Sequence, residues 1–226
     1  MCFSPVGDLV GGAVVVAIGV DACRHVKGRS ENLAIAVLPL LLGLHQIDET
    51  FVWWGLQGHV PANVGNAATW VYLVFALVAL PVIVPLMLVV FEPQRGRRWR
   101  YLPFLVLGLM VAGVIIHAML AGAPSARLGR FHISYSVGLQ HGIIVIGLYI
   151  VATCGSLLVS RNRSLRWFGV ANVVGVVALA VLCANGFTSL WCFYAALVSG
   201  AIAVHLRLES PSDAERATSR AARATS

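Results

Sequence analysis

Seven long apolar runs, separated by short polar breaks, dominate the chain. They cover Pro5–Cys23, Leu33–Trp54, Ala67–Phe91, Tyr101–Gly122, Ser136–Ser160, Leu165–Asn185 and Phe187–Leu206. A helix needs about 20 apolar residues to cross the hydrocarbon core of a bilayer, and each run approaches or exceeds that length. The pattern therefore predicts an all-α, polytopic membrane protein with seven transmembrane helices.

Composition agrees with this fold class. Of the 226 residues, 59% are hydrophobic and 11% are charged, whereas soluble domains carry about 25% charged residues. The net charge of +7 does not indicate nucleic-acid binding. Nearly all the cations lie in the breaks between apolar runs, and no basic face is interleaved with exposed aromatic residues.

The cations are distributed unevenly between the two sides that seven spans would create. Fourteen of the sixteen Lys and Arg residues lie in alternate breaks and in the C-terminal tail, while the other breaks hold only Arg127 and Arg130. Because cations collect in cytoplasmic loops, the N-terminus is predicted to lie outside and the C-terminus in the cytoplasm. Residues 1–208 are predicted to form the transmembrane domain, and residues 209–226 a disordered polar tail. The first residues lack the positively charged start of a removable signal peptide.

The second apolar run contains a dense group of polar residues. Ionisable side chains inside a span are costly and usually mark a functional site. His45, Asp48 and Glu49 are three or four residues apart, so they share one face of a helix. Gln46 points about 100° away from His45 and is the lesser candidate.

Depth in the membrane relates this group to two further histidines. With the N-terminus outside, Glu49, His117 and His141 would share one layer in the outer half of the bilayer, with His45 one turn deeper. Imidazoles with a carboxylate suit zinc, and also iron or copper. The predicted metal ligands are His45, His117, His141 and Glu49. Glu49 or Asp48 would act as general base toward a metal-bound water.

The same residues leave other functions open. Two of the histidines could bind haem as axial ligands in a redox membrane protein. His45 and Glu49 could instead form a protonatable pair in a proton-linked carrier or sensor without metal. A purely structural polar core, in which histidine and carboxylate satisfy each other across helices, is a further alternative.

The cysteines contribute one more candidate. Their spacing contains no CxxC pair, so iron–sulfur, zinc-ribbon and c-type haem motifs are absent from the sequence. Removal of Met1 would leave Cys2 as the first residue, where its thiol could act as a nucleophile. An ordinary N-terminal cysteine is the alternative. Cys183 and Cys192 lie toward the outer ends of adjacent predicted helices, where a disulfide is possible.

Three segments carry a resemblance to a known family. The opening MCFSPVGDLV, the segment HQIDETFVWWGLQGH and the tripeptide QHG resemble an uncharacterised family of bacterial seven-helix membrane proteins that begin with Met-Cys-Phe-Ser. The resemblance covers the spans but not the polar tail. It implies a multi-pass protein of the bacterial inner membrane and carries over no activity. The matching positions are Cys2, Asp8, His45, Gln46, Glu49 and His141.

A looser analogy is with the seven-helix metal-dependent hydrolases that include alkaline ceramidases and adiponectin-receptor-like proteins, which hold zinc through intramembrane histidines. The chain departs from them because its seventh run has no HxxxH pair. We expect a metal-dependent hydrolase of an amphiphilic, lipid-like substrate that enters from the lipid bilayer. Its candidate catalytic residues are Glu49, Asp48 and Cys2.

Overall fold

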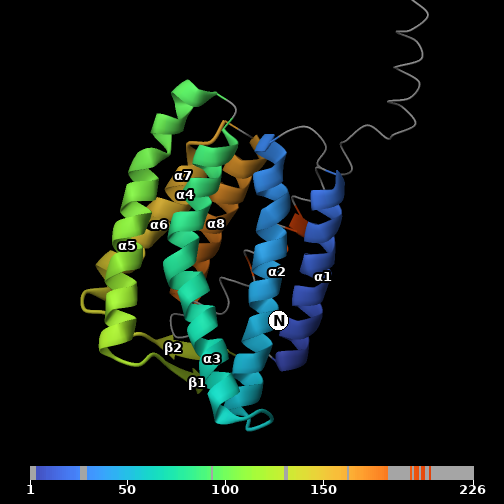
Figure 1. Cartoon of the computed structure of the whole chain (residues 1–226), viewed down its shortest axis with the longest axis vertical. Helices are drawn as coiled ribbons and strands as arrows, with labels where there is room; N and C mark the ends of the chain where they lie inside the picture. Colours follow the sequence, from blue (N-terminus) through green and yellow to red (C-terminus); the bar gives the residue numbers. More distant parts are fainter. Residues whose placement is uncertain are drawn as a thin grey trace, which may run out of the picture.

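A computed structural model describes residues 4–25, 30–92, 94–129, 132–161, 163–182, 194, 196–198, 200–201 and 204. Helices make up most of this part of the chain (Figure 1). In chain order the elements are α1 (Pro5–His25), α2 (Ser30–Leu56), α3 (Ala62–Leu73), the π-helical η1 (Val74–Ala79), α4 (Leu80–Phe91), the 3₁₀-helical η2 (Arg95–Arg100), α5 (Leu102–Ala121), β1 (Ser125–Leu128), β2 (Ile133–Ser136), α6 (Gly142–Ile150), the π-helical η3 (Val151–Gly155), α7 (Ser156–Leu158) and α8 (Arg163–Leu182).

The helices follow the apolar runs of the sequence closely. α1, α2, α5 and α8 each coincide with one run, and α3, η1 and α4 together form the third. Three stretches, Pro5–Arg24, Ala62–Val90 and Leu102–Ala121, are long and apolar enough to cross a membrane. The mostly helical class and a set of membrane-like helices are thus confirmed. The seventh run, Phe187–Leu206, lies largely outside the described residues, as does the polar tail.

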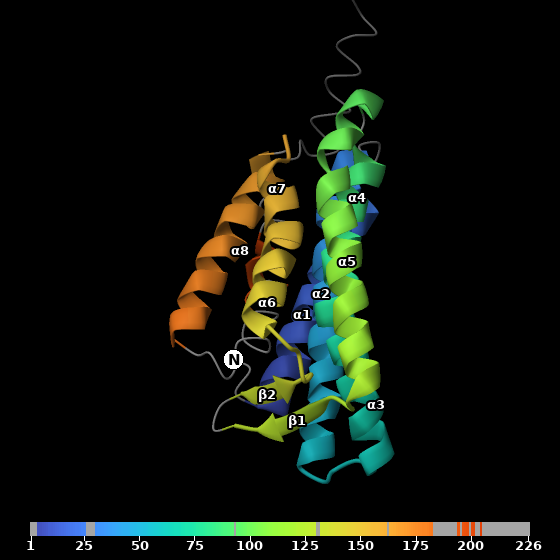
Figure 2. The same cartoon turned by 90° about the vertical axis from the view of Figure 1, so that its left-hand side faces the viewer.

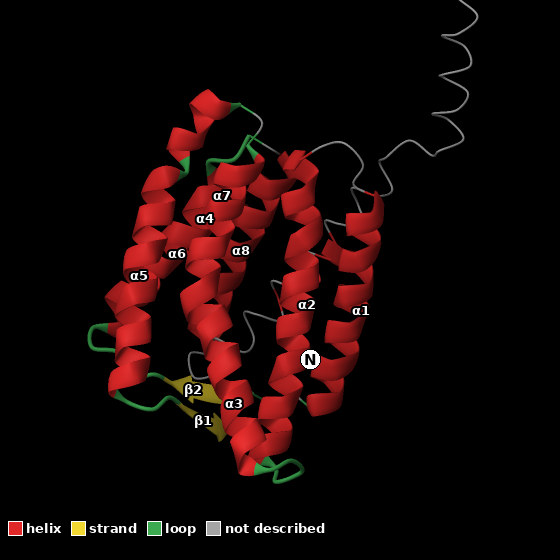
Figure 3. Cartoon of the chain, in the orientation of Figure 1, coloured by secondary structure: helices red, strands yellow, loops and turns green. Residues whose placement is uncertain are grey.

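The fifth predicted helix starts later than the sequence suggested. Helix α6 begins at Gly142 rather than at Ser136, because strand β2 (Ile133–Ser136) ends at Ser136 and residues 137–141 belong to neither element. β2 pairs with β1 in an antiparallel hairpin whose register runs from Ser125 opposite Ser136 to Leu128 opposite Ile133. Figure 3 shows the two strands together at one end of the helices. The predicted run shares only Ser136 with the strand, and local hydropathy does not separate residues 137–141 from the helix that follows them.

The helices pack in two layers. α1 contacts α2, α2 contacts α3, and α4 contacts α5. α6, α7 and α8 lie together beside this first layer (Figure 2). Glycine allows the closest approaches. A Cβ on Gly12 would lie 2.8 Å from the carbonyl oxygen of Gly43, and a Cβ on Gly55 would collide with Gly65. Larger side chains at these points would push α2 away from α1 or α3.

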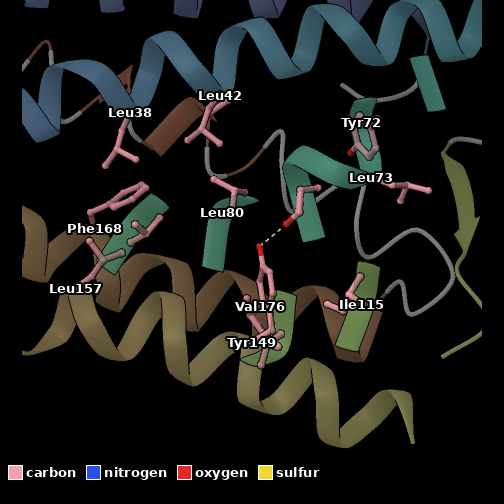
Figure 4. Close-up of a cluster of buried hydrophobic side chains, with 14 of the residues drawn as sticks. Leu38, Leu42, Tyr72, Leu73, Leu80, Ile115, Tyr149, Leu157, Phe168 and Val176 are labelled. Carbon is pink, nitrogen blue, oxygen red and sulfur yellow. Dashed lines mark hydrogen bonds between the residues drawn. The ribbon is translucent and has the colours of Figure 1, made fainter. Parts of the chain in front are cut away.

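The two layers meet in an apolar core around the π-helical segments (Figure 4). The Tyr149 hydroxyl, just before η3, donates a hydrogen bond of 2.7 Å to the carbonyl oxygen of Ala76 in η1. A π-helical turn inserts one extra residue into a helix, which displaces the regular hydrogen bonds. Further along, in α4, Pro85 has no N–H that could donate the helical hydrogen bond to the carbonyl of Pro81. Gly108 of α5 packs directly against that carbonyl.

Candidate functional site

Four polar residues are buried in the C-terminal half of α2. They are His45, Gln46, Glu49 and Thr50. Successive residues turn by about 100° around a helix, so these four cover an arc of about 140°, with Glu49 between His45 and Gln46. Both neighbours can therefore take part in the surroundings of Glu49.

Gln46 joins two carboxyl groups from different helices. Its Nε2 donates to Oδ1 of Asp8 at 2.8 Å and to Oε2 of Glu49 at 3.2 Å. Asp8 lies in the first turn of α1, and both carboxyl residues have an exposed fraction of 0%. Nearby, the Thr50 hydroxyl donates to the carbonyl of Pro5 at 3.4 Å, which fixes the start of α1 beside the pair. Gln46, the lesser candidate from helical spacing, is therefore the residue that connects the two carboxyl groups in the structure.

The hairpin supplies a residue that the sequence did not single out. The Tyr135 hydroxyl of β2 donates to Oε1 of Glu49 at 3.3 Å. The Tyr135 ring stacks on Tyr72 of α3, with centroids 4.6 Å apart. Tyr72 also stacks on the imidazole of His45, with centroids 4.1 Å apart, and Phe75 contacts this imidazole at 4.7 Å. Aromatic rings therefore connect His45 to the tyrosine that binds Glu49.

Three side chains near Glu49 carry buried polar atoms without a hydrogen-bond partner among the described residues. They are His45 at both ring nitrogens, Asp48 at Oδ2 and Trp53 at Nε1. All three lie on α2 within about one turn of Glu49. Buried polar atoms are normally hydrogen-bonded, often to an internal water molecule, so this part of α2 is a place where water is expected.

The predicted four-ligand metal site is not supported by the described part of the chain. His45 is buried, whereas His117 on α5 and His141 before α6 are exposed. His141 caps α6 with a left-handed backbone (φ 54°) rather than lying within a helix. No group of three or more His, Cys, Asp or Glu residues in the described ranges could hold a metal ion. A shared depth along the membrane normal does not fix the direction in which each helix turns its side chains.

The remaining site predictions have mixed outcomes. Zinc, haem or copper binding stays a prediction. The described residues contain no group of three or more His, Cys, Asp or Glu that could hold a metal ion. Asp48, a candidate general base, is partly buried and makes none of the contacts that hold Glu49. Cys2, Cys183 and Cys192 lie outside the described residues, so the nucleophile and the disulfide stay predictions. Cys23 and Cys154 are free thiols.

A cavity of about 340 Å³ opens between α2, α3 and β1, next to this cluster. It is lined by Val52, Gly55, Leu56, Ala62, Gly65, Asn66, Thr69, Trp70, Ala123, Pro124, Ser125 and Ala126. Three of these residues are direct neighbours of the site. Val52 follows Glu49 by one turn, Thr69 precedes Tyr72 by one turn, and Ala126 is the register partner of Tyr135.

Comparison with known proteins gives a family and no activity. A family of unknown function, DUF6629, matches residues 1–219. The chain belongs to this family. No curated protein and no solved structure matches the chain. The DUF6629 match includes Asp8, Gln46, Glu49 and Tyr135, so the whole cluster lies inside the family region. It also agrees with the resemblance to an uncharacterised family; the analogy with alkaline ceramidases stays a prediction.

Proposed function

We propose that this DUF6629 chain is a multi-pass protein of the bacterial inner membrane, with seven spans, an outer N-terminus and a cytoplasmic C-terminus. The outward-facing surface of its helices supports a lipid environment. Large apolar side chains that are at least half exposed occur on α1, α5, α6 and α8: Val6, Val14, Val114, Leu120, Ile143, Ile144, Val174 and Val177. Exposed apolar surface on this scale is unfavourable in water and is covered by lipid in a bilayer.

The orientation has a direct test. Alkaline phosphatase, which is active only outside the cytoplasm, would be fused after Gly58, after Arg100 and after Gly129. Activity is expected at Gly58 and Gly129 but not at Arg100, because the arginine-rich breaks belong on the cytoplasmic side. Activity at Arg100 would contradict the proposed orientation.

We further propose that the cluster of Asp8, Gln46, Glu49 and Tyr135 is a proton-binding site of a carrier or sensor that works without a metal. The observation that carries this function is the hydrogen-bonded chain from Tyr135 through Glu49 and Gln46 to Asp8. It contains three groups that exchange protons, and it lies inside the helical layer. Intramembrane carboxyl groups of this kind form proton relays in pumps and transporters.

Protonation of Glu49 would change the contacts between three elements. As a carboxylate, Glu49 accepts from Gln46 through one oxygen and from Tyr135 through the other. As a carboxylic acid it becomes a donor at one oxygen, so the hydrogen bond at that oxygen is weakened or reversed. Gln46 is in turn bound to Asp8 of α1. Proton uptake at Glu49 would therefore act on α1 and on the hairpin together, which is what a proton-linked change of conformation requires.

Infrared difference spectroscopy between acidic and neutral buffer tests this function on the full chain in liposomes. We expect a C=O band of a protonated carboxyl group in acid, and we expect Glu49→Gln to remove it. Glu92→Gln is the matched control, because Glu92 also accepts a tyrosine hydrogen bond but lies outside the cluster. A band that is unchanged in Glu49→Gln would refute the proposed function.

A further inference from the structure

We propose that the cavity between α2, α3 and β1 is the path by which water and protons reach Glu49, and that Tyr135 is the last group on this path. This inference rests on the proposed function and adds the side from which the proton arrives. Residues at the cavity mouth are exposed, including Asn66, Ala123 and Ser125. The buried cluster and the surface are thus separated by the depth of one cavity and its inner wall.

The cavity suits water. A water molecule occupies about 30 Å³ in the liquid, so a space of this size has room for several. The volume is about 340 Å³, and Asn66, Thr69 and Ser125 contribute polar side chains to its lining. The Thr69 hydroxyl donates to the carbonyl of Gly65 at 2.9 Å, which leaves the lone pairs of its oxygen to accept from a cavity water.

Part of the cavity lining belongs to the direct neighbours of the cluster. Val52, Thr69 and Ala126 form part of that lining, and Glu49, Tyr72 and Tyr135 are their neighbours along the helices and across the hairpin. The rings of Tyr72 and Tyr135 stack on each other beside these lining residues. The Tyr135 hydroxyl contacts the Glu49 carboxyl, so it connects this side of the cavity to the cluster.

Trp53 gives an independent sign of water behind this lining. Its side chain is 5% exposed, and Nε1 has no hydrogen-bond partner in the described ranges. Trp53 follows Glu49 by one turn of α2, toward the end of the helix where Gly55 and Leu56 line the cavity. An indole N–H that is buried in this way is normally satisfied by an ordered water. Such a water would lie between the cavity and Glu49.

The proton step is a concerted exchange at the Tyr135 oxygen. A protonated cavity water gives its proton to Oη of Tyr135 while the Tyr135 hydroxyl proton passes across 3.3 Å to Oε1 of Glu49. The water is left neutral, Tyr135 regains the proton that it gave up, and Glu49 becomes a carboxylic acid. Release of the proton follows the same steps in reverse.

Exchange into D₂O measures this path. After a rapid change of buffer, the Glu49 carboxyl band shifts as its proton is replaced by deuterium. We expect Tyr135→Phe and Asn66→Trp each to slow this shift at least tenfold, the first by removing the relay group and the second by filling the cavity. Ser125→Trp fills the same cavity from the hairpin and serves as a second plug if Asn66→Trp does not fold.

Two matched variants control for indirect effects. Tyr101→Phe removes a tyrosine–glutamate hydrogen bond elsewhere, and Val64→Trp places the same bulk about 200° around α3 from Asn66. Both are expected to exchange at the wild-type rate. If Tyr135→Phe and the cavity plugs also exchange at that rate while the Glu49 band is present, the path is wrong and the proposed function stands. If the wild type shows no Glu49 band, both proposals fail.

Discussion

Two tyrosine–glutamate pairs lie near opposite ends of the first helical layer, and they use the same contact in different surroundings. At one end the Tyr135 hydroxyl donates to Glu49 at 3.3 Å, and at the other the Tyr101 hydroxyl donates to Glu92 at 3.2 Å. Figure 1 places the hairpin at the lower end and the start of α5, which follows Tyr101, at the upper end.

The surroundings determine what each pair can do. Glu92 follows the last turn of α4, is partly exposed, and has Arg98 beside it, which donates to the carbonyls of Val90 and Glu92. Cations bound to the last carbonyls of a helix stabilise its C-terminus, so this pair belongs to a helix cap. Glu49 is fully buried, and it accepts hydrogen bonds from the neutral donors of Gln46 and Tyr135. The comparison teaches that the contact alone does not define a proton site.

The largest expected effect is a loss of stability at one end of the layer that has no counterpart at the other end. Gln46→Leu removes the donor shared by two buried carboxyl groups, so the free energy of unfolding should fall by about 3 kcal/mol. Gln94→Leu is the control, because Gln94 is exposed beside Glu92 and should change stability little. Denaturant titration of both variants in detergent measures the difference. Equal stabilities would show that the amide between Asp8 and Glu49 is dispensable.

A smaller effect tests whether the two tyrosines differ in function although their hydrogen bonds stabilise the fold equally. Tyr135→Phe and Tyr101→Phe each remove one hydroxyl, and each should lower the free energy of unfolding by about 1 kcal/mol. The infrared band of the Glu49 carboxyl should shift in Tyr135→Phe and stay in place in Tyr101→Phe. A shift in both variants, or in neither, would erase the distinction between the two pairs.

The smallest effect concerns alkaline pH. Burial, and also the nearby Glu92 carboxylate, raise the pKa of Tyr101 above its ordinary value of 10, although a hydrogen bond with Ser160 opposes them. A pKa raised in the folded state contributes stability below the unfolded value, and this contribution is lost as the pH rises from that value through the folded one. Tyr101→Phe should therefore flatten the alkaline decline in stability. Stability is measured against pH for the wild type and for Tyr101→Phe, and parallel curves would contradict this prediction. Tyr135→Phe, the variant at the other end of the layer, is measured for comparison.

The helices were predictable because hydropathy is a property of consecutive residues. The runs that became α1, α2, α5 and α8 needed no information from the rest of the chain. The hairpin needed it, because Ile133–Ser136 become a strand only through pairing with Ser125–Leu128. A window that reads local hydrophobicity carries no information about such pairing.

The site was predictable only where its residues carry a local signal in the sequence. Asp8, His45, Gln46 and Glu49 follow from the resemblance and from the cost of burying polar groups in a span. Tyr135 carries no comparable signal, since a tyrosine near the end of an apolar run is common at membrane surfaces. The described structure leaves His117 and His141 exposed, because position along a helix gives depth, while the direction of a side chain depends on packing against neighbours.

The π-helical segment η1 affects how the helix between Tyr72 and Leu80 tolerates a change in length. A π-helical turn holds one residue more than an α-helical turn, so deleting one residue within Val74–Ala79 would restore an uninterrupted α-helix and leave Leu80 facing the core. Deleting a second residue would have no such outlet and would turn everything beyond it by about 100° relative to Tyr72. The carbonyl of Pro81 would then lose its place against Gly108. The π-helical segment thus gives this helix a tolerance of one residue in length that a regular helix would lack.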